Sequence, residues 1–230
     1  MQKDFKDKVI VITGGSSGIG RALVECFINK GSKLSVCGRN LQALETLKKD
    51  LNYEGLFIYR ADVAIEEDCR EFIKNTLQQF GRIDVLINNA GISMRALFQD
   101  LETLEPIKKI MDVNFWGTVY CTKYAFPSLL NAKGIVVGIS SIAGSRGLPG
   151  RTGYSASKFA MQGFLEALRT ENLHTGVHVM WVSPYFTTSN IRNTALNSMG
   201  IPQGETPLED GQLMSAKEVA DAIFIAITRK

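Results

Sequence analysis

Short apolar runs, rich in β-branched residues, alternate along this chain with longer segments in which apolar residues recur at helical spacing. The apolar runs are nearly continuous, as in strands that are covered on both faces of a parallel sheet. The pattern predicts strands over residues 9–13, 33–38, 55–62, 83–88, 134–140 and 177–183. It predicts helices over residues 19–30, 41–50, 66–80, 101–131, 154–175 and 216–228.

This succession predicts an α/β fold with a doubly wound parallel sheet and helices on both of its faces. No Pro/Ser-rich linker interrupts it, so we expect a single domain over residues 1–230. Residues 184–214 have no regular period and are polar, with scattered Gly and Pro. A segment this long without regular structure is commonly a lid or a binding loop. We therefore expect it to form a substrate-binding loop.

The composition is that of an ordinary globular protein, with 45% hydrophobic and 21% charged residues. The net charge of +3 is spread along the chain instead of forming a basic tract, so a nucleic-acid partner is not expected. No apolar run approaches the roughly 18 residues of a membrane helix, and residues 1–7 lack the apolar core of a signal peptide. We expect a cytoplasmic protein without a membrane segment.

Cysteine and histidine do not form a metal-binding pattern. The four cysteines lie at long, irregular spacings, so we expect them to be reduced and mostly buried. His174 and His178 are four residues apart, but Thr175 and Gly176 should break the helix that a shared metal site would need. We predict no metal site.

A glycine-rich turn, Thr13-Gly14-Gly15-Ser16-Ser17-Gly18-Ile19-Gly20, joins the first predicted strand to the first predicted helix. Such a turn directs backbone N–H groups and the positive end of the helix dipole toward solvent, where they can bind a pyrophosphate. Glycine allows the phosphate and the sheet to approach the backbone closely. The turn predicts a dinucleotide site that includes Gly14, Ser16, Ser17, Gly18, Ile19 and Gly20.

The end of the second predicted strand indicates which dinucleotide is preferred. NAD-binding folds place a carboxylate there, which accepts hydrogen bonds from the ribose hydroxyls. This chain has Gly38-Arg39-Asn40 instead, and the guanidinium of Arg39 offers several donors to a 2′-phosphate. We therefore predict NADP(H), with NAD(H) as the weaker alternative.

Tyr154 and Lys158 lie one helical turn apart at the start of the fifth long helix. A free phenol has a pKa of about 10, and a nearby ammonium should lower that pKa toward the working range of an acid or base. Ser141 follows a predicted strand, at the sheet edge where open α/β folds bind ligands. We expect the three side chains to meet at one substrate oxygen and to exchange a proton with it.

These residues and three further motifs resemble the short-chain dehydrogenase/reductase family, in its shorter single-domain branch with a Rossmann fold, over residues 8–228. The glycine turn matches the family's T-G-x-x-x-G-x-G, and Tyr154 with Lys158 matches its Y-x-x-x-K. Asp62-Val63, the run Asn88-Asn89-Ala90-Gly91, the helical Asn114 and Ser141 complete the pattern.

The resemblance implies an oxidoreductase that interconverts a carbonyl and an alcohol by hydride transfer. It implies that Tyr154 is the acid/base, that Ser141 orients the carbonyl, and that Lys158 binds the nicotinamide ribose. It implies that Asn114 distorts its helix and holds a water in a proton relay to Lys158. The cofactor contacts implied in this way are Asp62, Val63, Asn88, Ala90, Gly91, Tyr154, Lys158, Thr187 and Ser189.

The chain departs from the family after the sixth predicted strand, where Tyr185 replaces the usual glycine of a P-G pair. The substitution adds a ring and reduces backbone freedom near the expected nicotinamide pocket. The substrate contacts expected are Ser141, Tyr154, Tyr185 and Phe186. Apolar residues of the loop favour an apolar or amphipathic carbonyl compound.

Other interpretations stay open. An NADP-binding sensor or scaffold protein would keep this fold without turnover, and Ser155-x-x-Lys158 fits the S-x-x-K of some serine hydrolases. The family resemblance also implies a homodimer or homotetramer through the long helix with Phe115 and Trp116. The partner expected in every case is a small molecule.

Overall fold

The computed structural model describes residues 4–204 and 213–229. In this part of the chain, parallel strands form a six-stranded sheet in the order β3-β2-β1-β4-β5-β6. This is the strand order of the Rossmann fold, so the predicted doubly wound sheet is confirmed. The strands are β1 Val9–Thr13, β2 Lys33–Gly38, β3 Leu56–Arg60, β4 Val85–Asn88, β5 Ile135–Ile139 and β6 His178–Val182.

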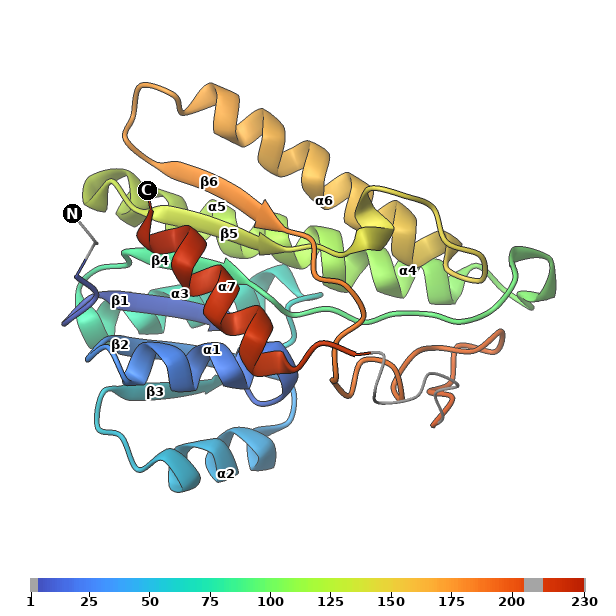
Figure 1. Cartoon of the computed structure of the whole chain (residues 1–230), viewed down its shortest axis with the longest axis horizontal. Coiled ribbons are helices and arrows are strands. Elements are labelled where there is room, and N and C mark those ends of the chain that lie inside the picture. The colour runs from blue at the N-terminus through green and yellow to red at the C-terminus, as the bar shows by residue number, and fades with distance from the viewer. Residues whose placement is uncertain (1–3, 205–212, 230) are drawn as a thin grey trace.

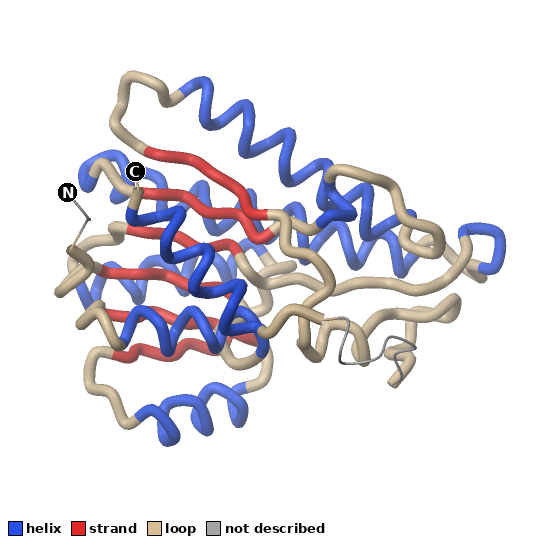
Figure 2. The backbone as a smooth tube through the Cα atoms, in the orientation of Figure 1, coloured by secondary structure: helices blue, strands red, loops and turns tan. Residues whose placement is uncertain are grey.

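Helices cover both faces of the sheet, and each face has its own apolar core (Figures 1 and 2). One core contains side chains from α1 (Gly18–Ile28), α2 (Leu41–Leu51) and α7 (Ala216–Thr228). The other core contains side chains from α3 (Glu66–Phe80), α4 (Glu105–Met111), α5 (Gly117–Ala132) and α6 (Thr152–Glu171). Burial on both faces explains why the strand sequences are nearly continuous apolar runs.

The strand order reverses at β1, which pairs with both β2 and β4. Connections on the two sides of this point run to opposite faces of the sheet, which leaves a crevice at the carboxyl ends of the strands. The glycine turn follows β1 and Asn89 follows β4, so both segments lie at this crevice.

The single helix predicted over residues 101–131 is wrong in detail. The structure has α4, then a π-helical segment η2 (Asp112–Trp116), then α5, and residues 101–104 precede α4 as turns. A π-turn is only one short segment of a longer helix, so the apolar periodicity of the whole stretch does not locate it. This segment contains Asn114.

The segment after β6 folds back over the carboxyl edge of the sheet (Figure 1). Isolated bridges join Met94 to Leu196 and Thr187 to Met214, which ties this segment to the chain after β4 and to the start of the last helix region. Residues 184–204 of the predicted loop 184–214 thus run over the crevice, residues 205–212 lie outside the described part, and a substrate-binding role for the loop stays a prediction.

No helix in the described residues is long and apolar enough to cross a membrane. All four cysteines are free, and Cys37, Cys69 and Cys121 are buried, which confirms the prediction of reduced and mostly buried thiols.

Candidate active site

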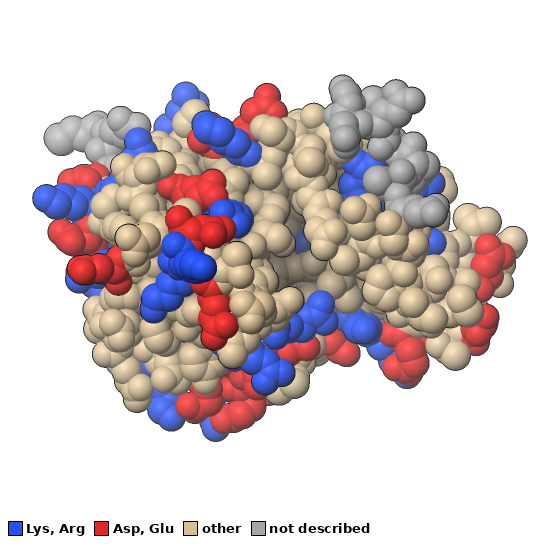
Figure 3. Space-filling model, turned by 90° about the horizontal axis from the view of Figure 1, so that it is seen from below, with Lys and Arg blue, Asp and Glu red and all other residues tan. Residues whose placement is uncertain are grey.

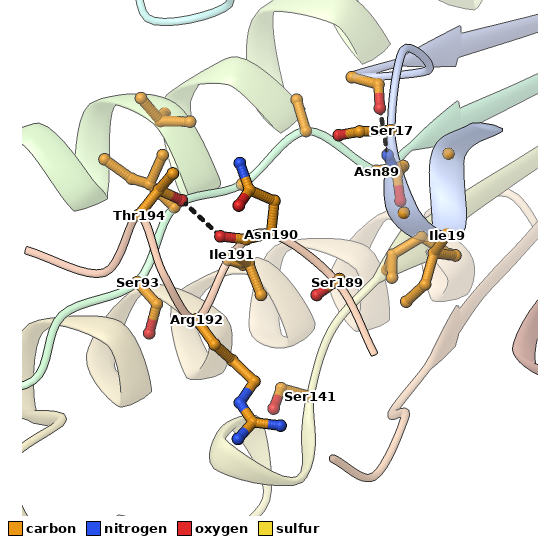
Figure 4. Close-up of a pocket in the computed structure, with 18 of the residues that line it drawn as sticks. Ser17, Ile19, Asn89, Ser93, Ser141, Ser189, Asn190, Ile191, Arg192 and Thr194 are labelled. Carbon is orange, nitrogen blue, oxygen red and sulfur yellow. Dashed lines mark hydrogen bonds between the residues drawn. The ribbon is translucent and has the colours of Figure 1, made fainter. Parts of the chain in front are cut away.

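A cavity of about 840 Å³ lies in the crevice at the carboxyl edge of the sheet. It is lined by the glycine turn, by residues after β2, β3, β4 and β5, by the start of α6 and by the loop after β6. Ser17, Ile19 and Asn89 lie at one end of it, and Ser93, Ser141 and Arg192 lie toward the other (Figure 4). The molecule is visibly hollowed here when it is seen from below (Figure 3).

The glycine turn forms one end of the cavity, as predicted. Gly14 and Gly18 have left-handed backbones, with φ of +67° and +53°. A Cβ added to Gly14 would lie 2.9 Å from Cα of Ala90, so only glycine lets these two segments pass each other. The predicted residues Gly14, Ser16, Ser17, Gly18, Ile19 and Gly20 all line the cavity.

The structure does not place Asn88 at the cavity, although it was predicted as a cofactor contact. Asn88 is the last residue of β4, is buried, and donates from Nδ2 to Oγ1 of Thr122 at 3.0 Å. Its neighbour Asn89 lines the cavity and donates from Nδ2 to the carbonyls of Thr13 and Gly14 at 2.9 and 3.0 Å. Successive side chains of a strand point to opposite faces, so the Asn88 side chain is turned away from the cavity that Asn89 lines, and a contact of Asn88 with the cofactor stays a prediction. Ala90 and Gly91 line the cavity as predicted.

Arg39 lies at the same end of the cavity and is exposed. Its carbonyl accepts a hydrogen bond from Nε of Arg60 at 3.4 Å, so a second arginine lies beside it. Asn40 also lines the cavity, and it caps α2 by accepting the N–H of Ala43 through Oδ1. The cavity wall here is completed by the predicted residues Asp62 and Val63.

Tyr154, Ser141 and Lys158 meet at the other end of the cavity, as predicted. Nζ of Lys158 lies 5.9 Å from the ring centroid of Tyr154, one turn earlier on α6. The ammonium is buried and donates to the carbonyl of Ile139 at 2.8 Å. Ser141 follows β5 and accepts the N–H of Ala143, which fixes its side chain at the sheet edge.

The phenol is less acidic in this structure than the sequence predicted. Burial raises the pKa of Tyr154, and the Ser141 side chain and the charge of Arg151 only partly oppose that rise. Burial also lowers the pKa of Lys158 to about 8. The expected lowering of the phenol pKa was therefore wrong, because removal of the phenol from water outweighs the neighbouring charges. Tyr154 is therefore protonated at neutral pH.

Asn114 lies in the π-turn η2, so the helix distortion implied by the family resemblance is present. Its Oδ1 accepts the N–H of Ile92 at 2.8 Å, and its Nδ2 donates to the carbonyl of Ile92 and to Oγ of Ser157 at 2.9 Å each. A Cβ added to Gly91 would lie 3.2 Å from Oδ1 of Asn114 and 3.5 Å from Nζ of Lys158. Asn114 therefore holds the wall of the cavity next to Lys158.

Replacement of Asn114 by alanine is expected to lower the free energy of unfolding by about 1–3 kcal/mol, because buried groups of Ile92 would lose their partners. Urea unfolding measures the difference. Asn131, which is exposed on α5, provides the control, since Asn131→Ala should change stability by less than about 0.5 kcal/mol. Equal stability of the two variants would contradict this role of Asn114.

The loop after β6 brings Tyr185, Phe186, Thr187 and Ser189 to the cavity, as predicted. Tyr185 has no positive φ, so the ring that replaces the family glycine fits an ordinary backbone conformation. It packs edge-on against Phe186, with 4.9 Å between ring centroids. Ser189 lies across from Gly18, where an added Cβ would come within 3.1 Å of its Cβ.

Several lining residues were not predicted from the sequence. Arg151 lies beside Tyr154 and donates to Ser93, and Arg192 reaches from the loop in the direction of Ser141 (Figure 4). Nothing in the sequence marks these positions, because they belong to three segments that meet only in the folded chain. The alternative nucleophile Ser155 is buried, accepts the N–H of Leu148 at 3.4 Å, and does not line the cavity.

Comparison with known proteins gives a family match over most of the chain. The family model described as short chain dehydrogenase matches residues 8–199. Dehydrogenase/reductase SDR family member 7B of Mus musculus is 38% identical over 98% of this chain and 72% of its own length. 11-beta-hydroxysteroid dehydrogenase-like 4A of Arabidopsis thaliana is 36% identical over 96% of this chain and 74% of its own length.

Solved structures show the same architecture. An alcohol dehydrogenase from Thermococcus sibiricus, complexed with 5-hydroxy-NADP, superimposes with a TM-score of 0.85 at 26% identity, over 96% of this chain and 90% of that one. A short-chain dehydrogenase/reductase from Burkholderia phymatum, in complex with NAD, also gives 0.85, at 24% identity, over 99% and 88% of the two chains. The second likeness shows the fold alone.

Proposed function

Because the chain belongs to the short-chain dehydrogenase family, we propose that it is an NADP(H)-dependent oxidoreductase that interconverts a ketone or aldehyde and its alcohol. One observation carries the proposal. Tyr154, Ser141 and Lys158 converge at the end of a cavity whose opposite end is the glycine turn. A dinucleotide that starts at the turn has its reactive end beside the phenol.

The residues of the cavity fit a nicotinamide dinucleotide. The left-handed Gly14 and Gly18 leave an open cradle before α1, and Cβ atoms there would fill it or strain the backbone. When bound, the dinucleotide supplies or accepts the hydride. We assign its pyrophosphate to the glycine turn, its adenosine to Asp62 and Val63, and its nicotinamide ribose to Lys158.

Tyr154 performs the proton transfer in this proposal. Burial keeps its phenol protonated at neutral pH, which is the form that donates a proton to a carbonyl oxygen during reduction. Ser141 holds the same oxygen from the side of β5. The buried ammonium of Lys158 adds positive charge beside the phenolate that forms, and Asn114 keeps the neighbouring wall in place.

The preference for NADP(H) is supported by Arg39, which lines the end of the cavity assigned to the adenosine, and by Arg60, whose Nε donates to the Arg39 carbonyl. An NAD-specific site has an acceptor carboxylate after the second strand, and this chain has Arg39 and Asn40 there. Guanidinium groups are suited to a 2′-phosphate, because they offer several charged donors in one plane.

Replacement of Arg39 by alanine is expected to lower the ratio of kcat/KM for NADPH to that for NADH by about 10- to 100-fold, the loss of roughly 1.5–3 kcal/mol for hydrogen bonds to a charged group. Steady-state rates with both nucleotides measure the ratio. Arg70→Ala on the exposed side of α3 serves as the control and should leave it unchanged. A wild-type preference for NADH, unaffected by the Arg39 variant, would refute the assignment.

Turnover separates this proposal from a nucleotide-binding sensor or scaffold. Oxidation of NADPH by the full chain is measured with a panel of ketones and aldehydes, and reduction of NADP with the matching alcohols. Steady turnover of any member supports the enzyme. Tight binding of NADPH with no turnover across the panel would support the sensor. We also propose a cytoplasmic homodimer or homotetramer, for which light scattering and cell fractionation are the tests.

A further inference from the structure

Arg151 is a partly buried cation at the cavity, next to the residue that donates the proton. It immediately precedes α6, its Nη1 donates to Oγ of Ser93, and its Cζ lies 6.0 Å from the ring centroid of Tyr154. No carboxylate in residues 4–204 and 213–229 forms an ion pair with it. Moving a guanidinium out of water without a carboxylate partner costs free energy. A function at the cavity would explain why Arg151 is placed there.

The position of Arg151 separates it from the cofactor end of the cavity. The segment after β4 passes the glycine turn at Ala90, passes Lys158 and Asn114 at Gly91, and reaches Arg151 at Ser93. Arg151 therefore lies beyond Lys158 along this segment, on the side away from the glycine turn. This is where a substrate must lie if the nicotinamide ribose is at Lys158.

Further positive charge gathers at the same place. Arg192, which is 8% exposed, lines the cavity and points in the direction of Ser141 (Figure 4). Burial lowers the pKa of Arg151, and the charges of Arg95 and Arg192 lower it further. The one carboxylate among the described lining residues is Asp62, which lies after β3 at the adenosine end. Among the described lining residues, none at the substrate end carries a negative charge.

We infer that Arg151 binds an anionic group of the substrate, a carboxylate or a phosphate that lies only a few bonds from the reacting carbonyl. The inference rests on the proposed function and specifies its substrate class. The short separation follows from the geometry, because the guanidinium lies 6.0 Å from the Tyr154 ring and the carbonyl oxygen must reach its hydroxyl. Leu148, Phe186 and Leu196 line the cavity as well, so the rest of the substrate meets apolar surface.

Arg151 could instead act only on Tyr154, whose pKa it lowers. The two roles predict different kinetics. A binding role affects KM and affects only substrates that carry the charge. A role confined to the phenol affects kcat for charged and neutral substrates alike and shifts the pH profile of the reaction.

The test uses two matched pairs of carbonyl compounds, acetoacetate with ethyl acetoacetate and hydroxyacetone phosphate with hydroxyacetone. The full chain is assayed with NADPH as wild type, Arg151→Met and Arg151→Lys. We expect wild type to prefer the anionic member of at least one pair, by about tenfold or more in kcat/KM. Arg151→Met should abolish that preference through KM, with a loss of kcat/KM on the anionic member about tenfold or more larger than the loss on the neutral member. Arg151→Lys should retain part of the preference. The pair that shows the effect identifies carboxylate or phosphate.

Turnover of the neutral members without any preference for the anionic ones would overturn the inference and leave the proposed function standing. An equal loss on both members, with a shifted pH profile, would also overturn it, since Arg151 would then act through Tyr154. A wild-type protein that reduces no carbonyl compound would refute the proposed function itself. Thermal unfolding shows whether each variant is folded. If Arg151→Met is unfolded, the kinetics of Arg151→Lys decide between a role in substrate binding and a role through Tyr154.

Discussion

Replacement of Tyr154 by phenylalanine is expected to lower kcat about 10²–10⁴-fold, the contribution of a positioned proton donor. The phenol lies where Ser141 and Lys158 converge, it is protonated at neutral pH because burial raises its pKa further above 10, and the change removes only its hydroxyl. Single-turnover oxidation of NADPH measures the rate of the chemical step. The dissociation constant for NADPH should change much less than kcat, because the glycine turn and Lys158 are untouched.

The matched control for this variant is Tyr120→Phe. Tyr120 lies on α5, where it stacks on Trp116 at 5.6 Å, and it does not line the cavity. Its variant should keep the wild-type rate. Full activity of Tyr154→Phe would contradict the assigned role, and an equal loss in both variants would show a general structural effect instead of a missing proton donor.

Replacement of Gly20 by alanine is expected to weaken binding of NADPH by at least about tenfold and to lower the free energy of unfolding by about 1–3 kcal/mol. Gly20 lies in the first turn of α1, and its added Cβ would come 2.2 Å from the carbonyl oxygen of Gly14 and 2.6 Å from Nδ2 of Asn89. Backbone atoms must move to admit it, so the N–H groups of the turn lose their positions. Isothermal titration with NADPH and urea unfolding measure the two effects.

Gly163→Ala on α6 is the control for this change, since nothing lies within 4 Å of an added Cβ there. Alanine in a helix interior is favoured over glycine by about 0.5–1 kcal/mol, so this variant should be slightly more stable and bind NADPH normally. Normal binding of NADPH by the Gly20 variant would show that the glycine turn is not part of the cofactor site.

The strands and the glycine turn at one end of the cavity could be predicted because local sequence determines them. A parallel sheet covered on both faces requires continuous apolar runs, and a dinucleotide turn requires glycine at fixed positions. The start of α6 was predicted only to within two residues, because Thr152 and Gly153 have no strong helical signal. The π-turn at Asn114 was invisible to periodicity, although the family resemblance implied a distortion there.

Two features of the site depend on the folded chain and could not be predicted. The pKa of Tyr154 is decided by how completely the surrounding segments exclude water, and helical spacing to Lys158 does not contain that information. The cluster of Arg151, Ser93 and Arg192 assembles from the start of α6, the segment after β4 and the loop after β6. Each of these residues taken alone is an ordinary polar residue of a turn or loop.

A crystal structure of the protein with NADP and a substrate analogue tests the central claim most directly. We predict that the pyrophosphate lies on the glycine turn, that the nicotinamide ring lies beside Tyr154, and that the analogue's oxygen is within about 2.6–3.2 Å of the phenol oxygen. A nicotinamide ring bound away from Tyr154, with the phenol oxygen out of reach of the analogue, would contradict the account.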